Sequence, residues 1–154
     1  MSWLTLAESD VKQRLSATEF DAVKASALAT GLTNAITEAL TEITNEVRGY
    51  VAACNANQLE TGAKIPPECL SAARDRLAYV LSLRLPTALP LNDHRVEANK
   101  AAIEFLKDVA ACKVGVEEPT NPVGGASEFF GGLAGGQTRI AMRSDDQDSD
   151  YDTD

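Results

Sequence analysis

Apolar side chains recur at three- and four-residue steps between Leu32 and Cys54, and this repeat constrains the fold more than any other feature of the chain. The spacing is that of one face of an α-helix, and polar side chains such as Glu38 and Arg48 occupy the opposite face. An amphipathic helix of this length gains most of its stability by burying its apolar stripe against other elements. The sequence therefore predicts a long packed helix over about 31–54.

Gly49 lies inside this predicted helix, where glycine is about 1 kcal/mol less favourable than alanine. Its missing side chain would allow another backbone to come close. We expect a neighbouring helix to approach at this point.

Further helices are predicted on both sides. Two capping boxes, Thr5 to Glu8 and Ser16 to Glu19, predict short helices over about 6–15 and 18–30. A segment of turn composition over 55–65 predicts a loop, and the Pro66-Pro67 pair that follows predicts a helix over 66–84. The last helix is predicted over 92–113, capped by Asn92 or Asp93 and stopped at Gly115.

The composition agrees with a helical fold. Apolar residues make up 44% of the 154 residues, enough for a core, whereas aromatic residues make up only 5%. Alanine and leucine dominate the apolar set, and both favour helix over strand. We expect an all-α fold, a small bundle of four to five helices, with 31–54 and 92–113 as an antiparallel pair packed against 66–84. Arg74 and Arg76 flank Asp75 on the face expected to be solvated.

The character of the sequence changes after Gly115. The remainder, with Gly115 itself, holds seven of the ten glycines, and from Lys113 onward three basic and nine acidic residues give a net charge of −6. A segment of this composition buries too little apolar surface to fold alone. We expect a domain over 1–115 and an extended Gly-rich, acidic C-terminal arm over 116–154, flexible when the protein is free.

The arm carries isolated apolar residues that have no core of their own. Two interpretations stay open: these residues fold back on the body, or they form a short anchor that docks into a pocket of a partner protein. On the second interpretation the candidate partner-binding residues are Phe129, Phe130, Leu133, Ile140 and Met142. The aspartates of the final ten residues resemble the start of a calcium loop, but Tyr151 stands where that loop needs glycine, which favours a solvated acidic tip.

The sequence contains no motif that indicates catalysis, a metal or a cofactor. The cysteines at 54, 69 and 112 lack the spacing of a zinc site, and we expect free buried thiols in a reducing cytoplasm. His94 is the only histidine, so a Ser-His or Cys-His enzyme would have to use it, although its place in the cap region between the last two helices favours a polar surface role. No apolar run reaches the ~20 residues of a membrane span, and the N-terminus lacks the pattern of a signal peptide.

Three short segments resemble a family of small proteins from Mu-type phages and prophages, long filed as a domain of unknown function. The opening WLTLAESDVKQRL at 3–15 is similar to the family's first motif. Gly49-Tyr50 and the Pro66-Pro67 helix start match its next features, and AIEFLKDVAACKVG at 102–115 matches its closing helix, with Cys112 in place of the family's common glycine.

The resemblance covers about residues 3–115 and implies a structural role with no catalytic residues. Members look like the head–tail connectors, or adaptors, of tailed phages. We therefore expect a virion protein of the neck, made in the host cytoplasm: a homo-oligomeric ring, possibly a dodecamer, between the portal and the tail or stopper proteins. DNA would pass through without specific binding, as fits a net charge of −9 with no basic patch. The alternative is a cytoplasmic helical protein that binds or regulates another protein of a phage or prophage.

Overall fold

The computed structural model describes residues 2–123, and its fold over this range is all-α, as predicted. Within these residues the structure has no strand, only two isolated bridges, Leu4 with Ile65 and Glu60 with Pro122. The elements in chain order are α1 (Glu8–Lys12), α2 (Ala17–Ala29), α3 (Ala35–Ala53), the short 3₁₀ turn η1 (Pro67–Cys69), α4 (Leu70–Arg84) and α5 (Asp93–Ala110). None of these helices is long and apolar enough to cross a membrane.

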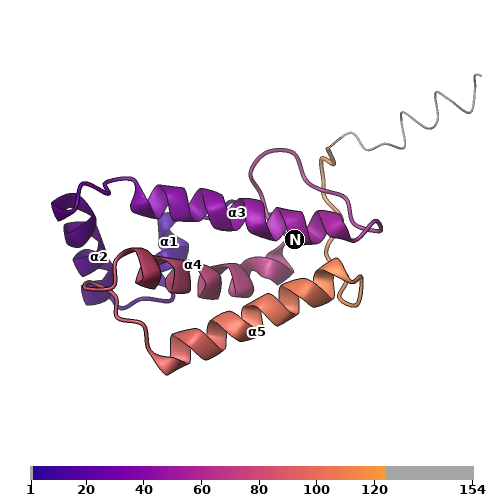
Figure 1. The fold of residues 1–154 in the computed structure, drawn as a ribbon. Helices are drawn as coiled ribbons and strands as arrows, with labels where there is room; N and C mark the ends of the chain where they lie inside the picture. Colours follow the sequence, from indigo (N-terminus) through magenta and orange to yellow (C-terminus); the bar gives the residue numbers. More distant parts are fainter. Residues whose placement is uncertain (1, 124–154) are drawn as a thin grey trace, which may run out of the picture. The chain divides into compact units, whose positions relative to one another are not determined.

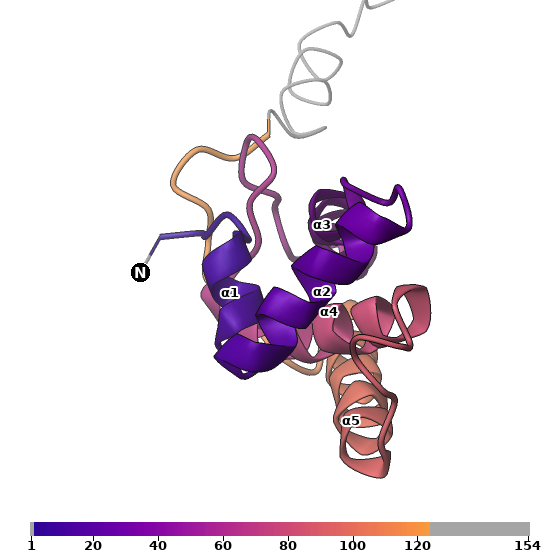
Figure 2. The ribbon, with the colours of Figure 1, turned by 90° about the vertical axis from the view of Figure 1, so that its left-hand side faces the viewer.

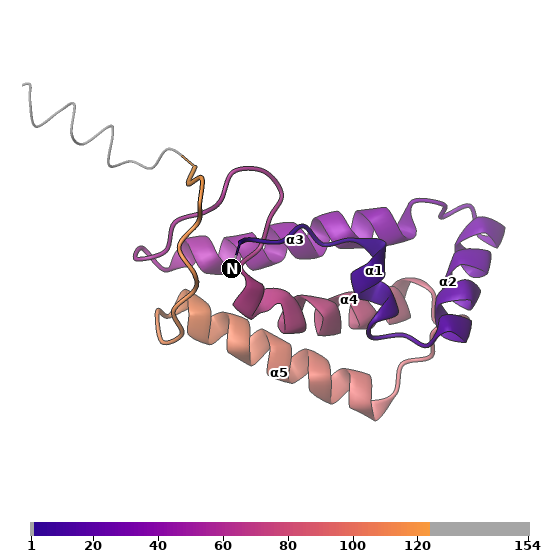
Figure 3. The ribbon, with the colours of Figure 1, turned by 180° about the vertical axis from the view of Figure 1, so that it is seen from behind.

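The three long helices pack on one another along their lengths, and α2 lies across one end of them (Figures 1 and 2). Arg84 at the end of α4 contacts Ala35 at the start of α3, so these two helices are antiparallel. The C-terminal ends of α3 and α5 meet, because a disulfide joins Cys54 to Cys112. Helices α3 and α5 are therefore parallel to each other, and the predicted antiparallel pairing of 31–54 with 92–113 is wrong (Figure 3). Each of the two intervening connections reverses the chain, and two reversals restore the original direction.

The core lies among α3, α4 and α5. The stripe identified in the sequence supplies Ile43, Val47 and Val51, which are completely buried, and Leu77 and Leu106 face them from the other two helices. The short helices complete this core, because Val11 of α1 and Val23 of α2 are also buried. The 3.6-residue pattern of α3 thus identified one of the buried helix faces that form the core.

One of the two predicted capping boxes is present. At Ser16 the hydroxyl accepts a hydrogen bond from the backbone N–H of Glu19 at 3.2 Å, and the Glu19 carboxylate accepts the N–H of Ser16 at 2.9 Å. The box predicted at Thr5 is wrong, because α1 begins only at Glu8. The preceding residues are held extended instead, since the N–H and carbonyl of Leu4 pair with Ile65.

Helix α5 ends at Ala110, three residues before the predicted helix end at 113 and five before Gly115. Its C′ residue is Cys112, which has a φ of 59°, in the left-handed region. The N–H of Cys112 donates to the carbonyl of Val109 and that of Lys113 to the carbonyl of Asp108, the two hydrogen bonds of a Schellman motif. That left-handed position usually takes glycine, and here a cysteine occupies it.

The basic residues of α4 do not form the solvated face that was predicted. Arg74 bonds the carboxylate of Asp10 in α1 at 2.8 Å. Arg76 forms a two-pronged ion pair with Glu46 of α3 and also donates to the side-chain oxygen of Asn99 in α5 at 2.6 Å. Both guanidinium groups are partly buried and join α4 to its neighbours. Their partners lie on three different helices, so α4 is surrounded on several sides.

Gly49 is exposed, and a Cβ built on it would meet nothing within 4 Å. No neighbouring helix within residues 2–123 approaches it, so the sequence-based expectation is wrong. The packing of this chain gives no reason for a glycine here.

We predict that Gly49→Ala stabilises the protein. Alanine fits the open space and restricts the unfolded chain, so the free energy of unfolding should rise by about 0.5–1 kcal/mol in urea titrations. Gly31→Ala is the matched control, because Gly31 also has open space around it but has a φ of +74°. The control should destabilise by about 1 kcal/mol. A loss of stability in Gly49→Ala would contradict the prediction.

Candidate functional site

The chain does not leave the folded body at Gly115. Residues 113–123, which we call the strap, run from the end of α5 along the 55–65 loop, and the compact unit extends to Val123. Residues 116–123, expected in the arm, are thus part of the body. The five predicted partner-binding residues, Phe129, Phe130, Leu133, Ile140 and Met142, lie beyond it, outside the described residues.

A disulfide joins the start of the strap to the end of α3. Cys54 and Cys112 are bonded, with their Cα atoms 5.3 Å apart, and they lie 58 positions apart in the sequence. The prediction of free thiols is wrong for this pair. Cys69 is the free thiol of the part described, and burial raises its pKa to about 12, so it stays protonated and unreactive at neutral pH. In the chain-entropy model, a disulfide that closes a loop of this length lowers the entropy of the unfolded chain and so raises the free energy of unfolding by roughly 4 kcal/mol.

Hydrogen bonds fasten the rest of the strap. The Trp3 indole N–H donates to the carbonyl of Glu117 at 2.9 Å, and the N–H of Glu117 donates to the Glu68 carboxylate at 3.2 Å. Further along, the N–H of Thr61 donates to the carbonyl of Asn121, and that of Val123 donates to the carbonyl of Leu59 at 2.7 Å. The strap is therefore tied to the N-terminus, to η1 and to the 55–65 loop.

Glu60 is the centre of this attachment. Its side chain is 1% exposed, and its carboxylate accepts the backbone N–H of Asn121 at 3.0 Å. This hydrogen bond lowers the pKa of Glu60; burial opposes the shift and the Lys64 ammonium, 3.6 Å away, assists it. Arg48 of α3 holds the same loop by donating to the carbonyls of Glu60 and Lys64. A buried carboxylate with these partners stabilises the strap only while it is ionised.

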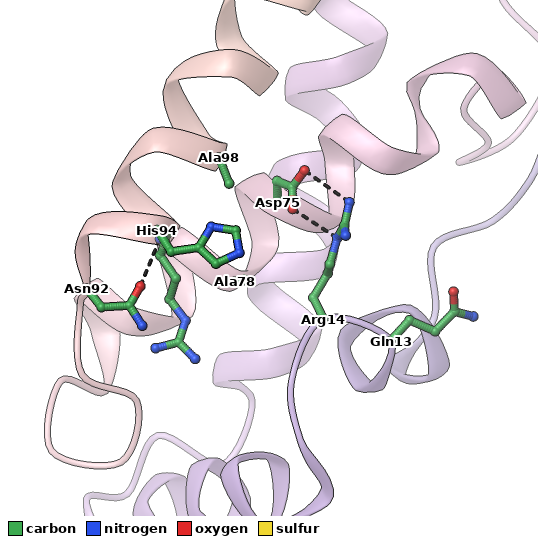
Figure 4. Close-up of a pocket in the computed structure, with 8 residues that line it drawn as sticks. Gln13, Arg14, Asp75, Ala78, Asn92, His94 and Ala98 are labelled. Carbon is green, nitrogen blue, oxygen red and sulfur yellow. Dashed lines mark hydrogen bonds and ion pairs between the residues drawn. The ribbon is translucent and has the colours of Figure 1, made fainter.

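A polar cleft of about 230 Å³ lies between α1, α4 and the start of α5 (Figure 4). Arg14 pairs with Asp75 through Nε at 2.9 Å and through a second N–H at 3.1 Å. The His94 ring lies between this pair and Asn92, which caps α5 by accepting the N–H of Arg95. Burial raises the pKa of Asp75, and the charges of Arg14 and His94 oppose the rise.

The charged groups of the cleft already have partners. Arg95 donates to the Glu19 carboxylate and to the carbonyl of Pro90, both at 2.6 Å, and Arg14 also donates to the Ser71 hydroxyl. The volume is below the ~300 Å³ of typical ligand pockets. No Ser, Thr, Cys or Lys lines the cleft. The arrangement therefore fastens α1 and α2 to α4 and α5, and His94 lies on an exposed first turn of α5.

Two functional features were missed by reasoning from the sequence. The disulfide had one signal, the cysteine in place of the family's common glycine near the end of the last helix. The strap had none, because its hydrogen bonds mostly use backbone groups that any residue supplies. Within residues 2–123 no cluster of three or more metal-binding side chains occurs.

Compared with known proteins, the chain matches no family model, no curated protein and no solved structure. The resemblance to the phage family therefore stays a prediction.

We predict that two truncations behave differently. A chain ending at Val123 should unfold like the full chain, because residues 1–123 form their own compact unit. A chain ending at Gly115 loses the hydrogen bonds of Glu117, Asn121 and Val123, and should lose about 2 kcal/mol or more at ~1 kcal/mol each. Urea titrations of the three chains measure this. Equal stability of both truncations would show that the strap contributes nothing.

We predict that the attachment of the strap weakens in acid. The pKa of Glu60 is lowered on folding from its ordinary 4.5, so its contribution is complete above that value and is lost as pH falls through the folded pKa. Glu60→Gln removes this titration and should flatten the fall in melting temperature below about pH 5. Glu118→Gln, an exposed change in the strap itself, is the control. A Glu60→Gln protein as acid-sensitive as the wild type would contradict the assignment.

Proposed function

We propose that this protein is a structural subunit of a phage neck, a head–tail connector that presents a C-terminal arm to its assembly partners. The observation that carries the proposal is the fastened strap. A segment that ended a domain without further role would not need a disulfide and hydrogen bonds to three parts of the body. Such an attachment fixes the point from which the 31 residues after Val123 start.

The disulfide favours the virion over the alternative, a cytoplasmic regulatory protein. Disulfides persist in oxidising surroundings, including the surfaces of virions, and are rare in proteins that stay in the cytosol. A neck protein is made in the host and then leaves it with the particle. The Cys54–Cys112 bond is consistent with that route.

The exposed apolar residues suggest where the body could contact a partner. Four of the large ones gather at the end of the bundle where α3 and α5 begin: Leu28, Leu32, Leu83 and Leu91. Leu28 is 69% exposed and Leu83 57%. Exposed leucines at this end, away from the strap, support the proposal that the body associates with other subunits there.

The charge supports a ring that surrounds DNA without gripping it. Residues 1–123 hold 12 basic and 16 acidic side chains, a net charge of −4, and many of the basic ones are paired within the body. Few guanidinium groups are left to neutralise phosphates, and a negative surface repels them.

The direct test is the composition of the particle. Purified virions of the producing phage should contain the protein by mass spectrometry, and mixing it with purified portal should give a particle of larger native mass. Absence from virions together with no portal association would overturn the proposal and favour the cytoplasmic alternative.

We predict that Phe129→Ala with Phe130→Ala weakens binding to the portal or to neighbouring subunits without unfolding the protein. Burying an aromatic side chain contributes about 1.5–3 kcal/mol, so losing two should weaken binding at least tenfold. Native mass and a thermal melt measure the two effects. Tyr151→Ala, an aromatic change in the acidic tip, is the control. If the double variant assembled like the wild type, the hypothesis that Phe129 and Phe130 anchor the arm would be wrong.

A further inference from the structure

We propose that the Cys54–Cys112 pair is a redox-sensitive lock on the strap: oxidised, it fixes the root of the C-terminal arm, and reduced, it lets the strap detach. The lock is a property of the isolated chain. It rests on the same disulfide as the proposed function, but it is tested on the isolated chain, whereas the proposed function is tested on virions and on binding to the portal, so the two can fail separately.

The disulfide lies where the strap leaves the last helix, so it holds the first residues of the strap against the body. Cys112 is the residue between the last turn of α5 and the strap, and Cys54 ends α3. Beyond it, the strap has little apolar contact with the body, because Val114 and Val116 are only partly buried. Without the disulfide, attachment rests on hydrogen bonds, which are individually weak because water competes for the same groups.

The backbone conformation at Cys112 indicates that the cysteine is there for its sulfur. Left-handed C′ positions are usually glycine, because a side chain there is strained. The hydrogen bonds of the Schellman motif would form equally well with glycine. What glycine cannot supply is the sulfur, so the cross-link is the gain that offsets the strained backbone.

The redox step is a two-electron exchange. On oxidation the thiols of Cys54 and Cys112 lose two protons and two electrons and form one S–S bond, while a small-molecule disulfide takes up both and splits into two thiols. A dithiol reverses the reaction. Cys112 is exposed and Cys54 is 2% exposed, so a reductant reaches the bond from the Cys112 side. The third thiol, Cys69, is completely buried and protonated, and does not compete.

The experiment compares the full chain after treatment with oxidised glutathione and with dithiothreitol. Alkylation in denaturant, followed by intact mass, should find one reactive thiol in the oxidised protein and three in the reduced protein. Reduction should lower the melting temperature by on the order of 10 °C. It should also speed hydrogen exchange of the strap amides at Glu117, Asn121 and Val123 by about tenfold, with little change at core amides of α4.

Matched variants separate the bond from the backbone. Cys112→Ser keeps the strained left-handed residue and loses the bond, so it should resemble the reduced wild type in both treatments. Cys112→Gly also loses the bond but relieves the strain, and should melt a few degrees above Cys112→Ser. Cys69→Ser should keep the full response to reduction.

Any of three results would overturn the lock. Three alkylated thiols after oxidation would mean that the bond does not form. Equal exchange of the strap amides in oxidised and reduced protein would mean that the bond does not control the strap. A reductant effect that survives in Cys112→Gly would likewise assign the response to another group.

Discussion

Burial of the apolar stripe of α3 is the constraint on which the rest of the structure depends. Ile43, Val47 and Val51 have no exposed surface, and they reach this state only because α4 and α5 both cover the helix. Completely burying such a side chain contributes about 1.5–3 kcal/mol. With α3 covered by two helices, each connection needs only to reverse the chain, and the parallel arrangement of α3 and α5 follows.

That parallel arrangement is what brings distant parts of the sequence together. Both helices end at the same place, so Cys54 and Cys112 become neighbours although they are 58 positions apart in the sequence. The 55–65 loop also begins there, and the strap finds its hydrogen-bond partners on that loop. An antiparallel pair would have placed the two cysteines at opposite ends of the bundle. The direction of one helix thus decides whether the chain can be cross-linked at all.

The helices were predictable where a local pattern determines them, as at the Ser16 box and the stripe of α3. Predictions failed where a residue's partner is remote in sequence. The sequence around Arg76 predicts a solvated side chain. Its partners Glu46 and Asn99 come close only in the folded protein. The sequence at Thr5 fits a capping box, but the backbone there is extended instead because Leu4 pairs with Ile65. The candidate site was less predictable than the helices, because the disulfide and the contacts of the strap join residues that are remote in sequence.

The position of the strap changes what the arm can do. An arm joined to a frayed helix end would lose orientation at its root, and its binding groups would pay a larger ordering entropy on docking. On the proposed function, a fixed attachment point at Val123 would raise the effective concentration of the arm's binding groups near a partner beside the 55–65 loop. The proposed docking of the arm would therefore be coupled to the fastening of the strap. Any condition that loosens the attachment, whether acid at Glu60 or reduction at Cys112, should also weaken the grip of residues more than a dozen positions away.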